Sequence, residues 1–283
     1  PAHIRARQAT EPAELSESAC LQRLAWTEWE RLWITETLSG VLLSRPPFTG
    51  QLEHREHMEA MAREIAAQRA ALTPEALARV AQEYAAAISS APADWWLRWK
   101  YADFLVNTGQ DKRAAAAHLR EVLNFLPFSV TVNARLALLL CELGEVDEAM
   151  RLARTALRLQ PGHADALFTL GFAHQLRSEP RQAQRYYLRA IRAQPEQGAA
   201  YNNLAAIWAS RGRHHRAAKL LRAAVNAMPD EPELRINLAV TLLQLGKRDE
   251  ALRELQAALR LDPASPQANQ LLRHQTLPLP QDN

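Results

Sequence analysis

Residues 196–229 read EQGAAYNNLAAIWASRGRHHRAAKLLRAAVNAMP, and this stretch decides the fold because its pattern returns along the chain. Its last residue, Pro229, is one of five prolines that follow one another at intervals of 34 residues, at positions 127, 161, 195, 229 and 263. A constant interval of this length is typical of stacked structural repeats, in which each unit packs mainly on its neighbours. The sequence therefore predicts a solenoid.

Other columns keep their residue size when each unit is numbered so that its proline is position 32. Small residues at positions 8, 20 and 27 allow two antiparallel helices to approach closely, while leucine at position 7 fills the seam between them. Glycine at position 15 ends the first helix with a positive φ, and because Ser178 replaces it in one unit we expect that turn to be the least regular. The columns are Leu136, Leu170, Leu204 and Leu238 at position 7; Ala137, Gly171, Ala205 and Ala239 at position 8; Ala149, Ala183, Ala217 and Ala251 at position 20; and Ala156, Ala190, Ala224 and Ala258 at position 27.

These columns resemble the tetratricopeptide repeat (TPR), most clearly from Tyr201 to Pro229 and from Leu234 to Pro263. The resemblance covers residues 94–263 and implies an all-α fold, a right-handed TPR superhelix (α-solenoid) of antiparallel helix pairs. Five units are expected, at residues 93–127, 128–161, 162–195, 196–229 and 230–263. The first of them has one extra residue between Gly109 and its proline.

Helices are also expected on both sides of the five units. Residues 51–92 are interpreted as a degenerate helix pair, with one helix from Leu52 to Ala71 and a second that starts at Pro74, a residue suited to the first helical position. Residues 1–50 are expected to form an N-terminal helical extension and a linker. Residues 264–283 are expected to form a capping helix, from Pro266 to His274, and a loose tail.

Composition narrows the classes of partner. The 34 Lys+Arg residues are balanced by 31 Asp+Glu residues, which we take to be spread among them, so no nucleic-acid partner is predicted. No apolar run approaches the roughly 20 residues that span a bilayer, and no signal peptide is evident, so we expect a soluble segment without membrane insertion. Because the chain begins without methionine, we expect it to be cut from a longer one. Its arginine excess over lysine is interpreted as coding bias and indicates a bacterial source.

No catalytic or cofactor motif occurs in the sequence, and we predict neither an enzyme nor a cofactor within these residues. His54 and His57 are three residues apart on an expected helix, but no third ligand is near, so a surface helix is favoured over a metal site. Cys20 and Cys141 are far apart in sequence and indicate neither a redox pair nor a zinc site.

Tryptophans cluster in two places. Trp95, Trp96 and Trp99 begin an expected first helix, where packing is favoured over a ligand site. Trp26, Trp29 and Trp33 form one apolar face of the N-terminal extension. That face is expected either to dock on the first repeats or to bind another domain.

The TPR resemblance implies that a partner binds on the concave surface, which is lined by positions 2, 5, 6, 9, 12 and 13 of each first helix. Asn203 and Asn237 share position 6, so their amides are expected to hydrogen-bond the backbone of an extended peptide; the alternative is that they only cap neighbouring helices. The predicted partner-binding residues are Arg135, Leu138, Glu142, Phe168, Phe172, Gln175, Asn202, Asn203, Ile236, Asn237, Val240 and Gln244.

Two functions follow from these resemblances. The first is a protein–protein interaction scaffold that binds a partner protein or an extended peptide. The carboxylate clamp of TPR co-chaperones is not reproduced, since Ala134, Leu138 and Ala199 occupy its positions, and chaperone tails are therefore disfavoured. The alternative is a C-terminal appendage of a larger bacterial enzyme, because residues 45–52 resemble the linker that follows an SGNH-hydrolase-like domain.

Overall fold

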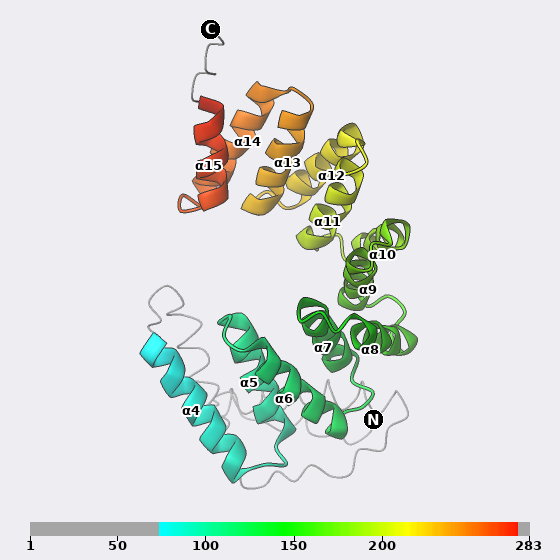
Figure 1. The fold of residues 1–283 in the computed structure, drawn as a ribbon, viewed down its shortest axis with the longest axis vertical. Helices are drawn as coiled ribbons and strands as arrows, with labels where there is room; N and C mark the ends of the chain where they lie inside the picture. The colour runs from blue at the N-terminus through cyan, green and yellow to red at the C-terminus, as the bar shows by residue number, and fades with distance from the viewer. Residues whose placement is uncertain (1–73, 277–283) are drawn as a thin grey trace, which may run out of the picture. The chain divides into compact units, whose positions relative to one another are not determined.

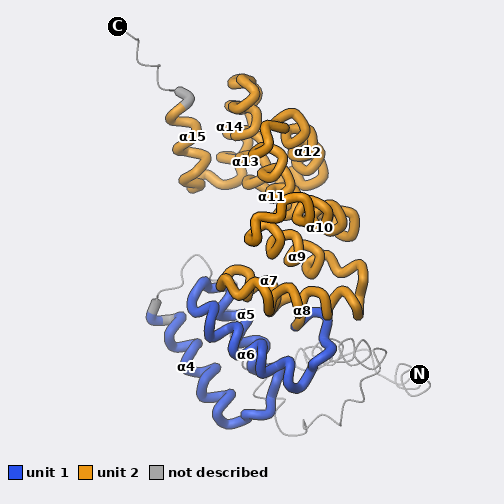
Figure 2. The backbone as a smooth tube through the Cα atoms, turned by 45° about the vertical axis from the view of Figure 1, so that its right-hand side comes forward, with its two compact units in different colours: residues 1–132 blue, residues 133–283 orange. Residues whose placement is uncertain are grey.

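The computed structural model describes residues 74–276, and all regular secondary structure in that range is helical (Figure 1). The chain divides into two compact units, residues 1–132 and 133–283 (Figure 2). The expectations for Trp26, Trp29, Trp33, His54, His57 and the C-terminal tail lie outside the described residues. Twelve helices occupy the described range: α4 (Pro74–Ser90), α5 (Trp95–Asn107), α6 (Lys112–Phe125), α7 (Val130–Glu142), α8 (Val146–Leu159), α9 (Ala164–Leu176), α10 (Pro180–Ala193), α11 (Gly198–Ala209), α12 (His214–Ala227), α13 (Pro232–Gln244), α14 (Arg248–Leu261) and α15 (Pro266–Thr276).

Alanine columns form the closest contacts of the helix pairs. The alanines at positions 20 and 27 are completely buried in all four regular units, with 0% exposure. A methyl group is the largest side chain that two helix backbones admit at such close approach. The packing predicted from the column pattern is therefore confirmed, and with it the all-α solenoid. These residues are Ala149, Ala156, Ala183, Ala190, Ala217, Ala224, Ala251 and Ala258.

Turns between the helices of a pair share one backbone conformation. Gly212 and Gly246 have φ values of 70° and 72°, the left-handed region that glycine adopts at low cost. Ser178 holds the same place with φ 58°, as the one non-glycine residue with a positive φ in the part of the chain that the structure describes. The bond that closes its turn, from Glu179 N to His174 O, measures 2.8 Å, equal to the equivalent Arg213 bond. The prediction that this turn is the least regular is therefore wrong. Ser178 adopts the same left-handed conformation as the glycines, and the turn keeps its hydrogen bond.

In two pairs of unit 2 the first helix buries more residues than the second, with six in α13 against three in α14. α9 buries seven of its 13 residues, whereas the following α10 buries three of 14. Within unit 2, α11 contacts α10, α12 and α13, so a first helix packs on its own partner and on both neighbouring pairs. First helices therefore lie between their neighbours, and second helices are amphipathic, with one face in the core.

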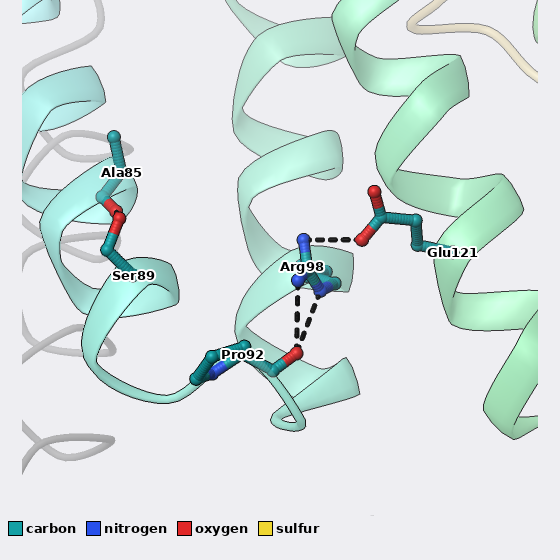
Figure 3. Close-up of polar contacts among 5 residues, drawn as sticks. All are labelled: Ala85, Ser89, Pro92, Arg98 and Glu121. Atoms are coloured by element: carbon teal, nitrogen blue, oxygen red, sulfur yellow. Dashed lines mark hydrogen bonds and ion pairs between the residues drawn. The ribbon is translucent and has the colours of Figure 1, made fainter.

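An arginine ties two of the helix pairs to the turn that precedes them. In α5, the Arg98 guanidinium donates to the carbonyl oxygen of Pro92 at 3.0 Å and pairs with Glu121 of α6 at 2.6 Å (Figure 3). Arg235 of α13 repeats this arrangement with the Pro229 carbonyl at 3.0 Å and a glutamate of α14. These carbonyl groups follow a helix end and have no partner within it, so the arginine satisfies an acceptor that the backbone leaves open.

Unit 1 has an aromatic core. Tyr84 of α4 is 1% exposed and stacks on Tyr101 of α5 with 5.1 Å between ring centroids. Trp95 is buried, as predicted for the first tryptophan of the cluster. Trp96 and Trp99 are half-buried, and the indole nitrogen of Trp99 donates to Asp103 at 2.8 Å.

Candidate partner-binding surface

First helices of unit 2 carry all of the residues predicted to bind a partner. Eleven of the twelve are half-buried or exposed, which leaves part of each side chain accessible. The exception is Ile236, whose exposure is 3%. Ile236 belongs to a hydrophobic cluster with Leu221 and Leu255, so the prediction that it contacts a partner is wrong. A branched apolar side chain beside the helix seam gains more from burial in the core than from exposure.

A chain of three polar side chains links two neighbouring first helices through a second helix. The Asn203 side-chain amide of α11 donates to the hydroxyl oxygen of Tyr187 in α10 at 3.2 Å. The Tyr187 hydroxyl in turn donates to Oε1 of Gln175 in α9 at 2.9 Å. Two predicted partner-binding residues are thereby held in fixed positions by one tyrosine.

Tyr187 is suited to this linking role because it cannot easily ionise. Its side chain has 0% exposure, and burial raises the pKa of its phenol far above the ordinary value. A neutral phenol keeps its proton for donation to Gln175 while it accepts from Asn203. The Phe168 ring lies 5.7 Å from the Tyr187 ring, and Phe172 stacks on Phe168 at 6.5 Å.

Asn203 and Asn237 therefore differ, although they occupy the same position in adjacent units. Asn203 is committed to Tyr187, whereas the Asn237 side chain makes no hydrogen bond to the described residues. The difference arises at position 24, where the seam residue is Tyr187 beside Asn203 and Leu221 beside Asn237. A leucine offers no acceptor, so the Asn237 amide stays available to an external partner.

Asn202 adds an unusual acceptor to the same helix. Its side-chain oxygen is buried and meets no hydrogen-bond donor among the residues that the structure describes. Buried polar atoms are nearly always paired, so this oxygen is an exception beside the predicted surface.

Three further observations concern a metal site, the one cysteine of the described residues and membrane spans. No group of three His, Cys, Asp or Glu residues within 74–276 is placed to hold a metal ion. Cys141 is buried, and burial, assisted by Glu142, raises the pKa of its thiol to about 12, so the nucleophilic thiolate does not form near neutral pH. A search of the described helices for one long and apolar enough to span a membrane gives none.

The sequence contains a signal for the Tyr187 link besides the repeated small residues. Tyr187 stands at position 24 of its unit, which Leu221 and Leu255 occupy in the next two units. A phenol in a buried seam needs a hydrogen-bond partner, and that need alone predicts polar neighbours on the adjoining first helices.

Comparison with protein families agrees with this geometry. One tetratricopeptide-repeat family model matches residues 173–232, and another matches residues 209–274. None of the curated protein sequences gives a significant match to the chain.

Solved structures with a similar fold include proteins that are described as TPR proteins. TTC0263, a thermophilic TPR protein from Thermus thermophilus, is 22% identical with a TM-score of 0.56, over 64% of this chain and 98% of that chain. PilW, a type IV pilus biogenesis factor, is 17% identical with a TM-score of 0.59, over 76% and 98% of the two chains. A TPR protein from Parabacteroides merdae is 16% identical with a TM-score of 0.54, over 78% and 89%. At such identities the likeness concerns the fold alone. The two family matches place residues 173–274 in the tetratricopeptide-repeat family, in agreement with the 34-residue columns and the stacked helix pairs.

Proposed function

We propose that the chain is a protein–protein interaction scaffold that holds an extended segment of a partner protein along the first helices of unit 2. The observation that carries the proposal is the Gln175–Tyr187–Asn203 chain, which fixes polar side chains of two successive repeats before any partner arrives. Side chains that are already ordered lose less entropy on binding, so they contribute more to affinity.

Polar and apolar groups on this surface have complementary tasks in the proposal. The Asn237 amide, which has no hydrogen bond to the described residues, pairs with the backbone of the bound segment. Phe168 and Phe172, which are half-buried and stacked on one another, contact its apolar side chains. Such a division gives affinity with loose sequence preference.

The proposed site keeps eleven of the predicted residues and omits Ile236. Arg135, Leu138 and Glu142 of α7 extend it toward the N-terminal end of unit 2, and Val240 and Gln244 extend it along α13. The alternative of an SGNH-hydrolase-like enzyme upstream rests on residues 45–52, which lie outside the described residues, and stays a prediction.

Two steps test the proposal. The chain is used as bait to capture a partner, and the affinity of the captured partner is then measured by calorimetry with Asn237→Ala. We expect a loss of about 1 to 3 kcal/mol in binding free energy, because the partner's backbone group is left unpaired. The melting temperature should stay unchanged, since Asn237 supports no described side chain.

Asn226 provides a matched control because it is an exposed asparagine on the outer helix α12. Asn226→Ala should leave both affinity and melting temperature unchanged. If Asn237→Ala binds the captured partner as tightly as the unaltered chain does, the first helices are not the binding surface.

A further inference from the structure

Basic residues are concentrated in one part of the chain. Residues 180–227 contain nine arginines and lysines but a single acidic residue, Glu196. Over the rest of the chain the acidic residues outnumber the basic ones. The expectation that charges of both signs are evenly mixed is therefore wrong for α10, α11 and α12.

Seven of these nine basic residues lie on two second helices, whereas Arg211 and Arg213 lie in the turn before α12. On α10 the arginines are four, four and three residues apart, which places them in one stripe along the helix. On α12 Arg216, Lys219 and Arg222 are three residues apart, with His215 next to Arg216, and neither helix contains an acidic residue. All members of both stripes are exposed: Arg181, Arg185, Arg189 and Arg192 on α10, and His215, Arg216, Lys219 and Arg222 on α12. We call these eight residues the basic surface.

α10 and α12 lie on the same side of unit 2. α10 and α12 follow one another along the side of the unit that second helices occupy, in both views of the chain (Figures 1 and 2). The partly buried Leu188 of α10 and Leu220 of α12 pack against one hydrophobic cluster, which places the two helices around a common core. The two stripes therefore belong to one continuous face.

Neighbouring second helices show what is missing from this face. α14 carries Asp249, Glu250 and Glu254 among its arginines, and Glu250 forms an ion pair with Arg222 of α12. The residue 34 positions before Glu250 is Arg216, so α12 has a cation at the position where α14 has a carboxylate. Arg181, Arg185 and Arg192 have no ion pair with any described residue.

Uncompensated like charges on adjacent helices repel and oppose folding, whereas they attract an external anion. We propose that the basic surface docks an Asp/Glu-rich segment of a partner protein, separately from the first-helix surface. The chain itself shows the interaction, since Arg222 already binds a carboxylate supplied by the next repeat. Guanidinium groups match carboxylates in geometry as well as in charge.

Other polyanions fit this face less well. Single-stranded nucleic acids bind through exposed aromatic rings on which bases stack. The Tyr186 ring beside the stripe is instead stacked on His174 at 5.2 Å and covered by Arg189 at 5.6 Å. No large hydrophobic side chain of α10 or α12 is exposed, so the face offers nothing to insert into a membrane.

The test compares two charge-reversal variants that change the net charge equally. The first replaces Arg181, Arg185 and Arg192 by Glu on α10. The control replaces Arg151, Arg154 and Arg158 by Glu on α8, a second helix whose arginines are also exposed but stand beside Asp147 and Glu148. Each triplet includes one arginine in the last helical turn, so both variants disturb the helix dipole alike.

The probe is a fluorescein-labelled peptide of about twelve glutamates, long enough to cross both helices at about 3.3 Å per residue. Fluorescence anisotropy at low ionic strength should show binding that added salt weakens, and the α10 variant should bind at least about tenfold more weakly. The α8 variant and Asn237→Ala should bind like the unaltered chain, while circular dichroism melts confirm that all variants fold. The Asn237→Ala variant separates this proposal from the proposed function, because it tests the first-helix surface while the α10 variant tests the basic surface. Either surface can therefore be disproved without the other.

Three results would overturn the assignment. An equal loss in the α8 variant would mean that net charge alone attracts the probe. Tighter binding of an oligonucleotide, single-stranded or duplex, that is lost in the α10 variant would move the partner to nucleic acid. Binding to phosphatidylserine vesicles that is lost in the α10 variant, and that is stronger than peptide binding, would identify the partner as a membrane surface.

Discussion

Gly171 of α9 lies directly against the ring of Tyr187 in α10. A Cβ atom added at Gly171 would stand 2.6 Å from both Cδ1 and Cε1 of Tyr187, much closer than carbon atoms approach in proteins. The next two units have a different pair of residues at the equivalent positions, Ala205 with Leu221 and Ala239 with Leu255. The glycine and the tyrosine are therefore a matched pair.

Gly171→Ala should destabilise the protein. The added methyl group overlaps a fully buried ring, and overpacking of this kind costs about 1 to 3 kcal/mol. Urea denaturation measures the loss. The double variant Gly171→Ala with Tyr187→Leu reproduces the neighbouring units, and it should be less destabilised than the sum of the two single changes. Additive losses would show that the two residues do not share one space.

Ala217→Leu or Ala251→Leu should cost about 1 to 3 kcal/mol in the free energy of unfolding through overpacking. Both alanines have 0% exposure at the close approach of a helix pair. Ala223 of α12 is exposed and serves as the control, since leucine there meets solvent. A thermal melt in which the buried and exposed substitutions behave alike would contradict this placement.

Ser178→Gly should stabilise the chain by up to about 1 kcal/mol. An L-residue pays about 1 to 2 kcal/mol in the left-handed conformation, and glycine avoids this cost but loses roughly half of the gain through its freer unfolded state. Gly212→Ser is the reverse change in an equivalent turn, where φ is 70°, and it should destabilise. Chemical denaturation of both variants checks the opposite signs; a shift in the same direction would refute the argument.

His163→Asn should reduce the loss of stability in mild acid. The Nδ1 atom of His163 accepts the backbone N–H of Ala166 at 3.3 Å at the start of α9, and a nitrogen that carries a proton cannot accept. Burial lowers the pKa of this imidazole, so the unfolded chain binds the proton more readily than the folded chain does. Stability is therefore complete above the unfolded value of about 6.5 and falls as the pH drops toward the lower folded value.

Asparagine keeps the cap without titrating in this range. Unfolding free energies at about pH 7.5 and 5.5 should therefore differ less in His163→Asn than in the unaltered chain. His118, whose pKa burial also lowers, remains in both proteins and accounts for part of the residual slope. Identical slopes would exclude His163 from the acid response.

Local and repeated features could be read from the sequence because each of them depends on residues within one repeat. The 34-residue interval, the alanine columns and the turn glycines state which residues must be small and where a helix must end. In a solenoid every unit has the same packing requirements, so a residue type that recurs at one position in four units indicates the same structural role in each. The start of α4 at Pro74 and the capping helix α15 followed from equally local rules.

Features that join different repeats could not be read in the same way. The position of Ile236 in its repeat predicted a place on the partner surface. In the structure Ile236 packs with residues of α12 and α14 in the core. The repeat positions also gave Asn203 and Asn237 one role, although the residue on an adjoining second helix decides whether each amide is occupied.

The sequence by itself thus determined the repeat, the helix pairs and the small residues of their seams, because spacing along the chain fixes those contacts. Only the tertiary structure decided that Gln175, Tyr187 and Asn203 meet, and that the basic stripes of α10 and α12 lie on one face. These arrangements depend on side chains from three helices and on how consecutive pairs stack, since a hydrogen bond or an unpaired charge is set by what surrounds it in space.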